Sequence, residues 1–164
     1  MSIGTSIPTV KGLLVDALSA RTWPTGTVVG YDPPRFAEHV EAGLNVFLLN
    51  DAVDIDHDVD VFNGSNPVEF EETYELTVVV ESVTDTDGGD QRDRDTEAAA
   101  MLAEVVDTVA SDPTLGHTAT AELPQIGVHL AGGGSYEGGR GAGYLVGARQ
   151  TIDVEVTATI ANQT

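Results

Sequence analysis

The sequence contains no cysteine and a single lysine, Lys11, and it has no long run of apolar residues. The absence of cysteine excludes disulfide bonds, thiol nucleophiles and cysteine-ligated zinc or iron–sulfur sites. No apolar run approaches the ~20 residues that a membrane-spanning helix needs. The opening residues, MSIGTSIPTVKG, lack the basic and apolar regions of a signal peptide. We therefore expect a soluble protein that is made in the cytoplasm and has no membrane partner.

Positive charge is also scarce. Only 7 Lys and Arg residues stand against 27 Asp and Glu residues in a chain of 164, which gives a formal net charge of −20. Contacts to phosphate groups rely on Lys and Arg, so this charge argues against a sequence-specific nucleic-acid partner. The hydrophobic content of 41% argues against disorder. An acidic, lysine-poor folded protein is suited to molar salt, where charges are screened within a few ångströms, and this indicates a haloarchaeal setting.

Periodicity in the sequence predicts two helices and four to six strands. Apolar residues at helical spacing predict one helix that ends near Arg21 and a second from about Asp95 to Ser111. Alternation of apolar and polar residues predicts long strands at 72–81 and 144–161 and shorter ones at 27–31, 44–49 and within 119–131. Most connections are hairpin-like. We therefore expect one α+β domain over residues 1–164, with a mostly antiparallel sheet and both helices on one face.

Two segments do not fit this simple pattern. Residues 51–66 form a polar, acidic run in which apolar residues alternate with acids, as in an edge strand or an extended arm. Residues 132–143, GGGSYEGGRGAG, are mostly glycine, which predicts a mobile loop. Tyr136 and Arg140 lie in this loop. A tyrosine offers apolar area with a polar tip, and an arginine can meet an acidic partner, so both are interface candidates.

Metal binding and catalysis find little support in the sequence. Asp85, Asp87 and Asp90 surround a Gly-Gly pair and are weak candidates for a cation site, but the glutamate that would complete a calcium loop is missing. The aspartates of 51–60 lack the order of an EF-hand and are read as a solvated edge. The glycine-rich segment matches neither a nucleophile elbow nor a phosphate-binding loop. We expect no enzyme activity and no cofactor.

Arg92 and Arg94 stand out in a chain with so few cations. Both are expected just before the second helix. They could pair locally with Asp90, Asp93 or Asp95, or they could reach an acidic patch of a neighbouring subunit. Exposed ion pairs contribute only ~0–1 kcal/mol, so either role requires partial burial. Both alternatives stay open at this point.

The chain resembles the tail terminator, or tail completion, proteins of long-tailed viruses with non-contractile tails. The resemblance lies in the order of an N-terminal amphipathic helix, a long strand entered through EETY, an acidic loop, a second helix, the motif DPTLG at 112–116 and a C-terminal alternating strand. It covers about residues 7–160. The glycine-rich segment at 132–143 departs from the family pattern.

This resemblance implies a structural virion protein without enzyme activity. It implies a homo-hexameric ring at the head-proximal end of the tail, which ends growth of the tail tube and joins the tail to the head. The implied partners are further copies of the chain, the tail tube protein and a head–tail connector or stopper protein. Two alternatives are another neck protein, such as a head completion, stopper or connector protein, and a halophilic cation-binding domain.

Overall fold

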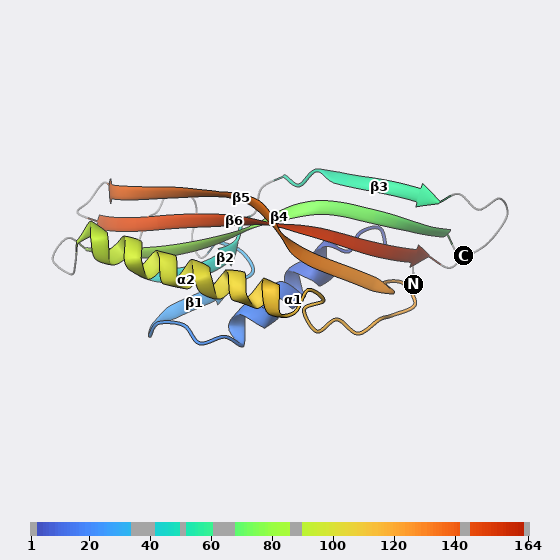
Figure 1. The fold of residues 1–164 in the computed structure, drawn as a ribbon, viewed down its shortest axis with the longest axis horizontal. Coiled ribbons are helices and arrows are strands. Elements are labelled where there is room, and N and C mark those ends of the chain that lie inside the picture. Colours follow the sequence, from blue (N-terminus) through green and yellow to red (C-terminus); the bar gives the residue numbers. More distant parts are fainter. Residues whose placement is uncertain are drawn as a thin grey trace.

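The computed structural model describes residues 3–33, 42–49, 52–60, 68–85, 90–141 and 145–162. Two helices and six strands follow one another along the chain (Figure 1). Their bounds are α1 Ile7–Ser19, β1 Thr27–Gly30, β2 Gly43–Leu48, β3 Ile55–Asp60, β4 Val68–Asp85, α2 Gln91–Ser111, β5 Gln125–Gly141 and β6 Leu145–Asn162. Within the described residues, neither helix is long and apolar enough to cross a membrane.

All six strands belong to one sheet. Five of them follow the order β1-β2-β4-β6-β5, and β3 pairs with β4 outside this order. β1 and β2 are parallel, and every other pair is antiparallel. β4 is the central strand: β6 pairs with it along its whole length. Along the other edge of β4, β2 and β3 lie one after the other: β2 pairs with residues 78–83 and β3 with residues 69–74. The three longest strands run side by side across the molecule in Figure 1.

Both helices pack on the same face of the sheet, as the sequence predicts for an α+β fold. Alternate residues of β4 turn towards this face, and the ladder sets Leu76 opposite Val154 and Val78 opposite Ile152. The helices close one common core over them, and α2 contacts β4, β5 and β6 (Figure 1). The helical contribution to this core is Val10, Leu14, Leu18, Met101, Val105 and Val109.

A buried carboxylate attaches the start of α1 to the central strand. Glu72 is fully buried, and it accepts hydrogen bonds from the backbone N–H of Ser6, at 2.8 Å, and from the hydroxyl of Thr5. A negative charge at the N-terminus of a helix is favourable because the unpaired N–H groups and the helix dipole point at it. Ser6 occupies the N-cap position, but its side chain makes no cap hydrogen bond. Its hydroxyl instead lies 2.9 Å from that of Tyr74, whose pKa is raised by burial.

The prediction of a mobile loop at residues 132–143 is wrong for most of its length. Residues up to Gly141 belong to β5 and pair with β6, and only 142 and 143 lie outside the described residues. The glycines permit close packing here. A Cβ on Gly134 would lie 2.5 Å from the carbonyl oxygen of Thr151, and one on Gly138 would lie 2.9 Å from the ring of Tyr136. The segment is therefore a glycine-rich strand and not a free arm.

Two further expectations are refined. The acidic segment 51–66 contains β3, so its described part is an edge strand of the sheet and not an extended arm; residues 51 and 61–66 lie outside the described ranges. The second helix begins at Gln91, four residues before the predicted start. Arg92 and Arg94 therefore lie in its first turn and do not precede it. Asp90 fixes this start by accepting a hydrogen bond from the backbone N–H of Asp93, at 2.9 Å.

Candidate assembly surfaces

Arg94 makes its contacts within its own subunit. Its Nη1 donates to the hydroxyl of Ser82 and to a carboxylate oxygen of Glu97, both at 2.9 Å. The Ser82 hydroxyl also donates to this oxygen, at 2.6 Å. Ser82 is fully buried on β4, so the three side chains attach the first turn of α2 to the sheet. Arg94 thus forms a local ion pair, which is one of the two alternatives left open by the sequence. Its partner is Glu97 and not one of the three predicted aspartates.

Arg92 is exposed on the first turn of α2, and no ion pair involves it among the residues that the structure describes. The two arginines are therefore expected to respond differently to substitution. Arg94→Met should lower the free energy of unfolding by about 1–2 kcal/mol, because Glu97 loses a charged hydrogen-bond partner in a half-buried place. Arg92→Met should change it by less than about 0.5 kcal/mol. Urea unfolding at constant high salt checks both, and equal losses would contradict the assignment.

Tyr136 connects the C-terminal half of β5 to the start of α2. Its hydroxyl donates to a carboxylate oxygen of Asp95 at 2.7 Å, which is the main cause of its raised pKa. The side-chain amide of Gln91 donates to the same oxygen at 2.8 Å and to the backbone carbonyl of Gly147 at 2.8 Å. Tyr136 nevertheless stays 55% exposed. Arg140 lies opposite Val146 in the ladder.

The weak metal candidates do not form a site in the described structure. Asp85 ends β4, and Asp87 lies outside the described residues. Asp90 caps α2. Among the residues described, no three carboxylate or imidazole side chains gather as they would around a metal ion.

The face of the sheet opposite the helices is acidic over its β3 half. Exposed Glu75 lies directly opposite exposed Glu155, and Asp58 lies opposite Glu71. Like charges in directly opposed positions destabilise a sheet, so this surface depends on screening by salt. The sequence shows the alternating acids, but only the register reveals which of them face each other. The β2 half of this face differs, since Phe47 and Val79 are buried there.

The large apolar side chains that remain exposed in the described structure all lie on edge strands or directly beside one. They are Val28 and Tyr31 at β1, Ile55 on β3, and Leu130 and Tyr136 on β5. The Lys11 ammonium lies 4.2 Å above the ring of Tyr31, a cation–π arrangement. The sequence does not identify Val28 and Tyr31 as edge residues, because a short apolar strand does not reveal whether it is central or at an edge.

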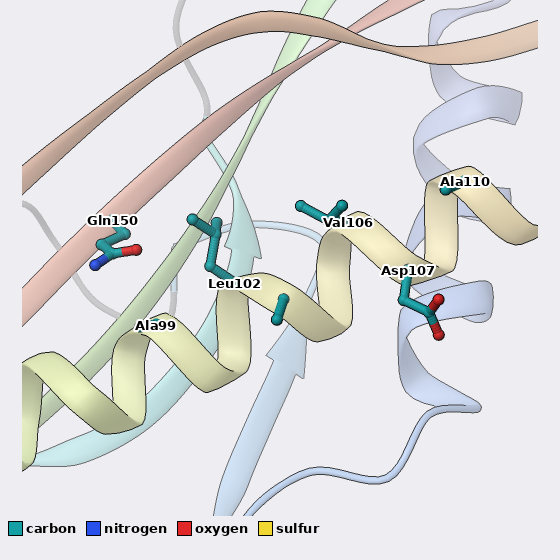
Figure 2. Close-up of a pocket in the computed structure, with 7 residues that line it drawn as sticks. Ala99, Leu102, Val106, Asp107, Ala110 and Gln150 are labelled. Atoms are coloured by element: carbon teal, nitrogen blue, oxygen red, sulfur yellow. The ribbon is translucent and has the colours of Figure 1, made fainter.

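The flank of α2 next to Gln150 of β6 carries a shallow apolar depression (Figure 2). The aspartate at its rim, Asp107, pairs with Arg21. Arg21 Nε also donates to Glu104 at 2.7 Å, so these contacts tie the end of α1 to α2. The depression is lined by Ala99, Leu102, Ala103, Val106, Asp107, Ala110 and Gln150.

The regions that could contact another protein are thus the two edges of the sheet, its acidic face and the flank of α2 next to Gln150. No protein-family model matches this chain, and a search of curated proteins finds no match either.

Proposed function

We propose that this protein is a structural subunit of a haloarchaeal tailed virus. In this proposal several copies form a ring at the head-proximal end of the tail, end growth of the tail tube and join the tail to the head connector. The observation that carries the proposal is the placement of the exposed apolar side chains at the edges of an open sheet. Such edges offer unpaired backbone groups and apolar area to another chain.

A sheet that is open at both ends favours head-to-tail assembly. If one end of each copy contacts the opposite end of the next, the contacts repeat around a ring and close when the rotation per subunit allows it. The order of α1, β4, α2, the DPTLG turn and β6 supports placing this ring in the tail terminator family, which the sequence resembles. Two helices on one sheet favour a terminator over a head completion or stopper protein, which tend to be smaller β-barrels.

The acidic face fits a neck protein as well. DNA phosphates are repelled by a surface that carries Glu71, Glu75 and Glu155 and little positive charge. DNA could therefore pass such a ring without being held by it. The proposed partners are further copies of the chain, the tail tube protein and a connector or stopper protein.

Inactivating the gene in the virus that encodes it tests this proposal. We expect tails of irregular, excessive length that do not join to heads, together with DNA-filled heads without tails. Supplying the intact protein should restore joined particles, and electron microscopy measures both. Native mass spectrometry of purified virions should find the protein in a closed ring. Normal, infectious particles that lack the protein would refute the proposal.

A further inference from the structure

We infer that the open half of β5 in one copy, residues 134–141, pairs antiparallel with β1 of the next copy. Residues 27–31 of the neighbour, at the other end of its sheet, would thus continue the sheet across the subunit boundary. This inference rests on the self-association in the proposed function and does not depend on a place in a virion.

Only part of the outer edge of β5 is available for pairing with a strand of another copy. In the first half, the backbone N–H of Val128 donates to the carbonyl oxygen of Pro113 at 2.7 Å, so the turn after α2 covers that stretch. Val128 thereby turns its backbone groups away from β6. Since these groups alternate along a strand, the odd-numbered residues of β6 bond to β5. The register after the bulge sets Ser135 opposite Thr151. The residues whose N–H and C=O groups point outwards are therefore Tyr136, Gly138 and Arg140.

The strand directions make this pair antiparallel. β1 runs parallel to β2, β2 runs antiparallel to β4, and two further antiparallel steps lead through β6 to β5. β1 and β5 of one subunit therefore run in opposite directions. In a head-to-tail ring each copy keeps the same orientation relative to the ring axis, so β5 meets the next β1 in opposite directions too. Antiparallel pairing is the slightly more stable type.

Charge favours these two edges over other surfaces. Copies with a net charge of −20 repel one another, so contact is least unfavourable where local charge is absent. Residues 27–31 contain no charged side chain, and within 132–141 one acid, Glu137, is balanced by Arg140. β3, the other free edge, has aspartates at 56, 58 and 60. An acidic edge strand of this kind prevents pairing between sheets.

Apolar area also favours the pair. Tyr31 and Tyr136 both lie on the helix-covered side of the sheet, Tyr31 beneath Lys11 and Tyr136 against Asp95. Pairing of the two edges places both tyrosines at the junction, where aromatic cross-strand contacts stabilise a sheet. It also covers Val28, on the opposite face. A two-fold pair of β5 with β5 would leave Val28 and Tyr31 exposed.

The absence of cysteine makes a cross-linking test direct. Val28 and Ser135 both lie on the face opposite the helices, opposite Asn45 and Thr151 of their neighbouring strands. Because β1 is shorter than the open part of β5, Val28 has more than one position on β5 that it can face. Glu137, on the same face as Ser135, therefore serves as a second position for cysteine. Directly opposed residues of an antiparallel pair lie ~4.5–5.5 Å apart at Cα, within disulfide range. The variants are Val28→Cys, Ser135→Cys and Glu137→Cys, with Ile55→Cys on β3 and Thr118→Cys in the exposed segment before β5 as controls.

We expect oxidation of Val28→Cys mixed with Ser135→Cys or Glu137→Cys, in about 1 M NaCl, to give covalent dimers that neither partner forms alone. A chain with both substitutions should give a ladder of higher multimers. Dimers of Ser135→Cys alone would indicate a two-fold β5 pair and overturn the inference. So would a stronger cross-link to Ile55→Cys than to Val28→Cys, or yields no higher than with Thr118→Cys.

A second measurement needs no cross-link. Val28→Lys places a charge on an exposed edge position, so the subunit should still fold but associate at least tenfold more weakly in sedimentation at about 1 M NaCl. Ile55→Lys places the same charge on another exposed edge position, so the subunit should also fold, and its association should be unchanged. The reverse pattern, or a monomeric parent protein, would overturn the inference. If the cross-links form as expected but the protein is absent from virions, only the viral role is refuted. If virions contain rings whose subunits are joined by other edges, only this strand pairing is refuted.

Discussion

Transfer from about 1 M to about 0.01 M salt is expected to lower the unfolding temperature by at least ~10 °C, which corresponds to ~3–5 kcal/mol for a chain of this size. The Debye length grows from ~3 Å to ~30 Å over this range. The net charge of −20 then repels itself across the whole molecule, and the opposed pair Glu75 and Glu155 loses its screening. Differential scanning calorimetry over a salt series measures the shift.

Two controls make the cause specific. Glu75→Gln removes one of the opposed charges, so it should raise the unfolding temperature at low salt and leave it nearly unchanged at high salt. Calcium chloride and sodium chloride should protect equally at equal ionic strength. Protection by millimolar calcium alone would instead indicate a cation site, and an unfolding temperature independent of salt would contradict the charge explanation.

Replacement of Glu72 is expected to have the largest effect of any single acidic residue in the described structure. Its buried carboxylate accepts from Ser6 N–H and from the Thr5 hydroxyl. In Glu72→Ala both donors lose their charged acceptor and a cavity opens beside α1. Hydrogen bonds to a buried charged group contribute ~1.5–3 kcal/mol each, so we expect a loss of about 3–5 kcal/mol. Urea unfolding at constant high salt measures it.

Glu75→Ala is the matched control, since it lies on the same strand three residues away but is exposed. It should change the free energy of unfolding by less than about 0.5 kcal/mol. Glu72→Gln should fall between the two, because it keeps the size of the side chain and one acceptor oxygen but not the charge. A Glu72→Ala variant as stable as Glu75→Ala would show that α1 does not depend on this contact.

The sequence predicted the elements whose side chains repeat regularly. The alternation of Leu76, Val78 and Val80 indicated β4, and helical spacing around Met101 and Val105 indicated α2; both are confirmed. These signals are local, because each residue takes its face from its own position along the element. The α+β class, with both helices on one face, followed from them.

The C-terminal half of β5, residues 134–141, could not be predicted in this way. Glycine has no side chain to alternate, and its backbone entropy favours a loop in an isolated segment. Contacts outside the segment decide the outcome: β6, its hairpin partner, supplies the ladder, and Asp95 on α2, which is distant in sequence, accepts the hydrogen bond of Tyr136. The burial of Glu72 and the edge position of Val28 also depend on pairing between distant strands. The candidate edges therefore emerged only from the sheet order.

The position of β6 between β4 and β5 has a kinetic consequence. Its ladder with β4 joins Asp85 to Leu145 at one end and Val68 to Asn162 at the other, so every rung closes a long loop of chain. Contacts between distant residues slow folding, and sheets dominated by them form in milliseconds to seconds. On a ribosome, β4 and β5 emerge before the strand that joins them exists. The β1-β2-β4 part of the sheet can therefore form first, whereas β5 joins the sheet, and its outer edge takes its place, only after β6 has been synthesised.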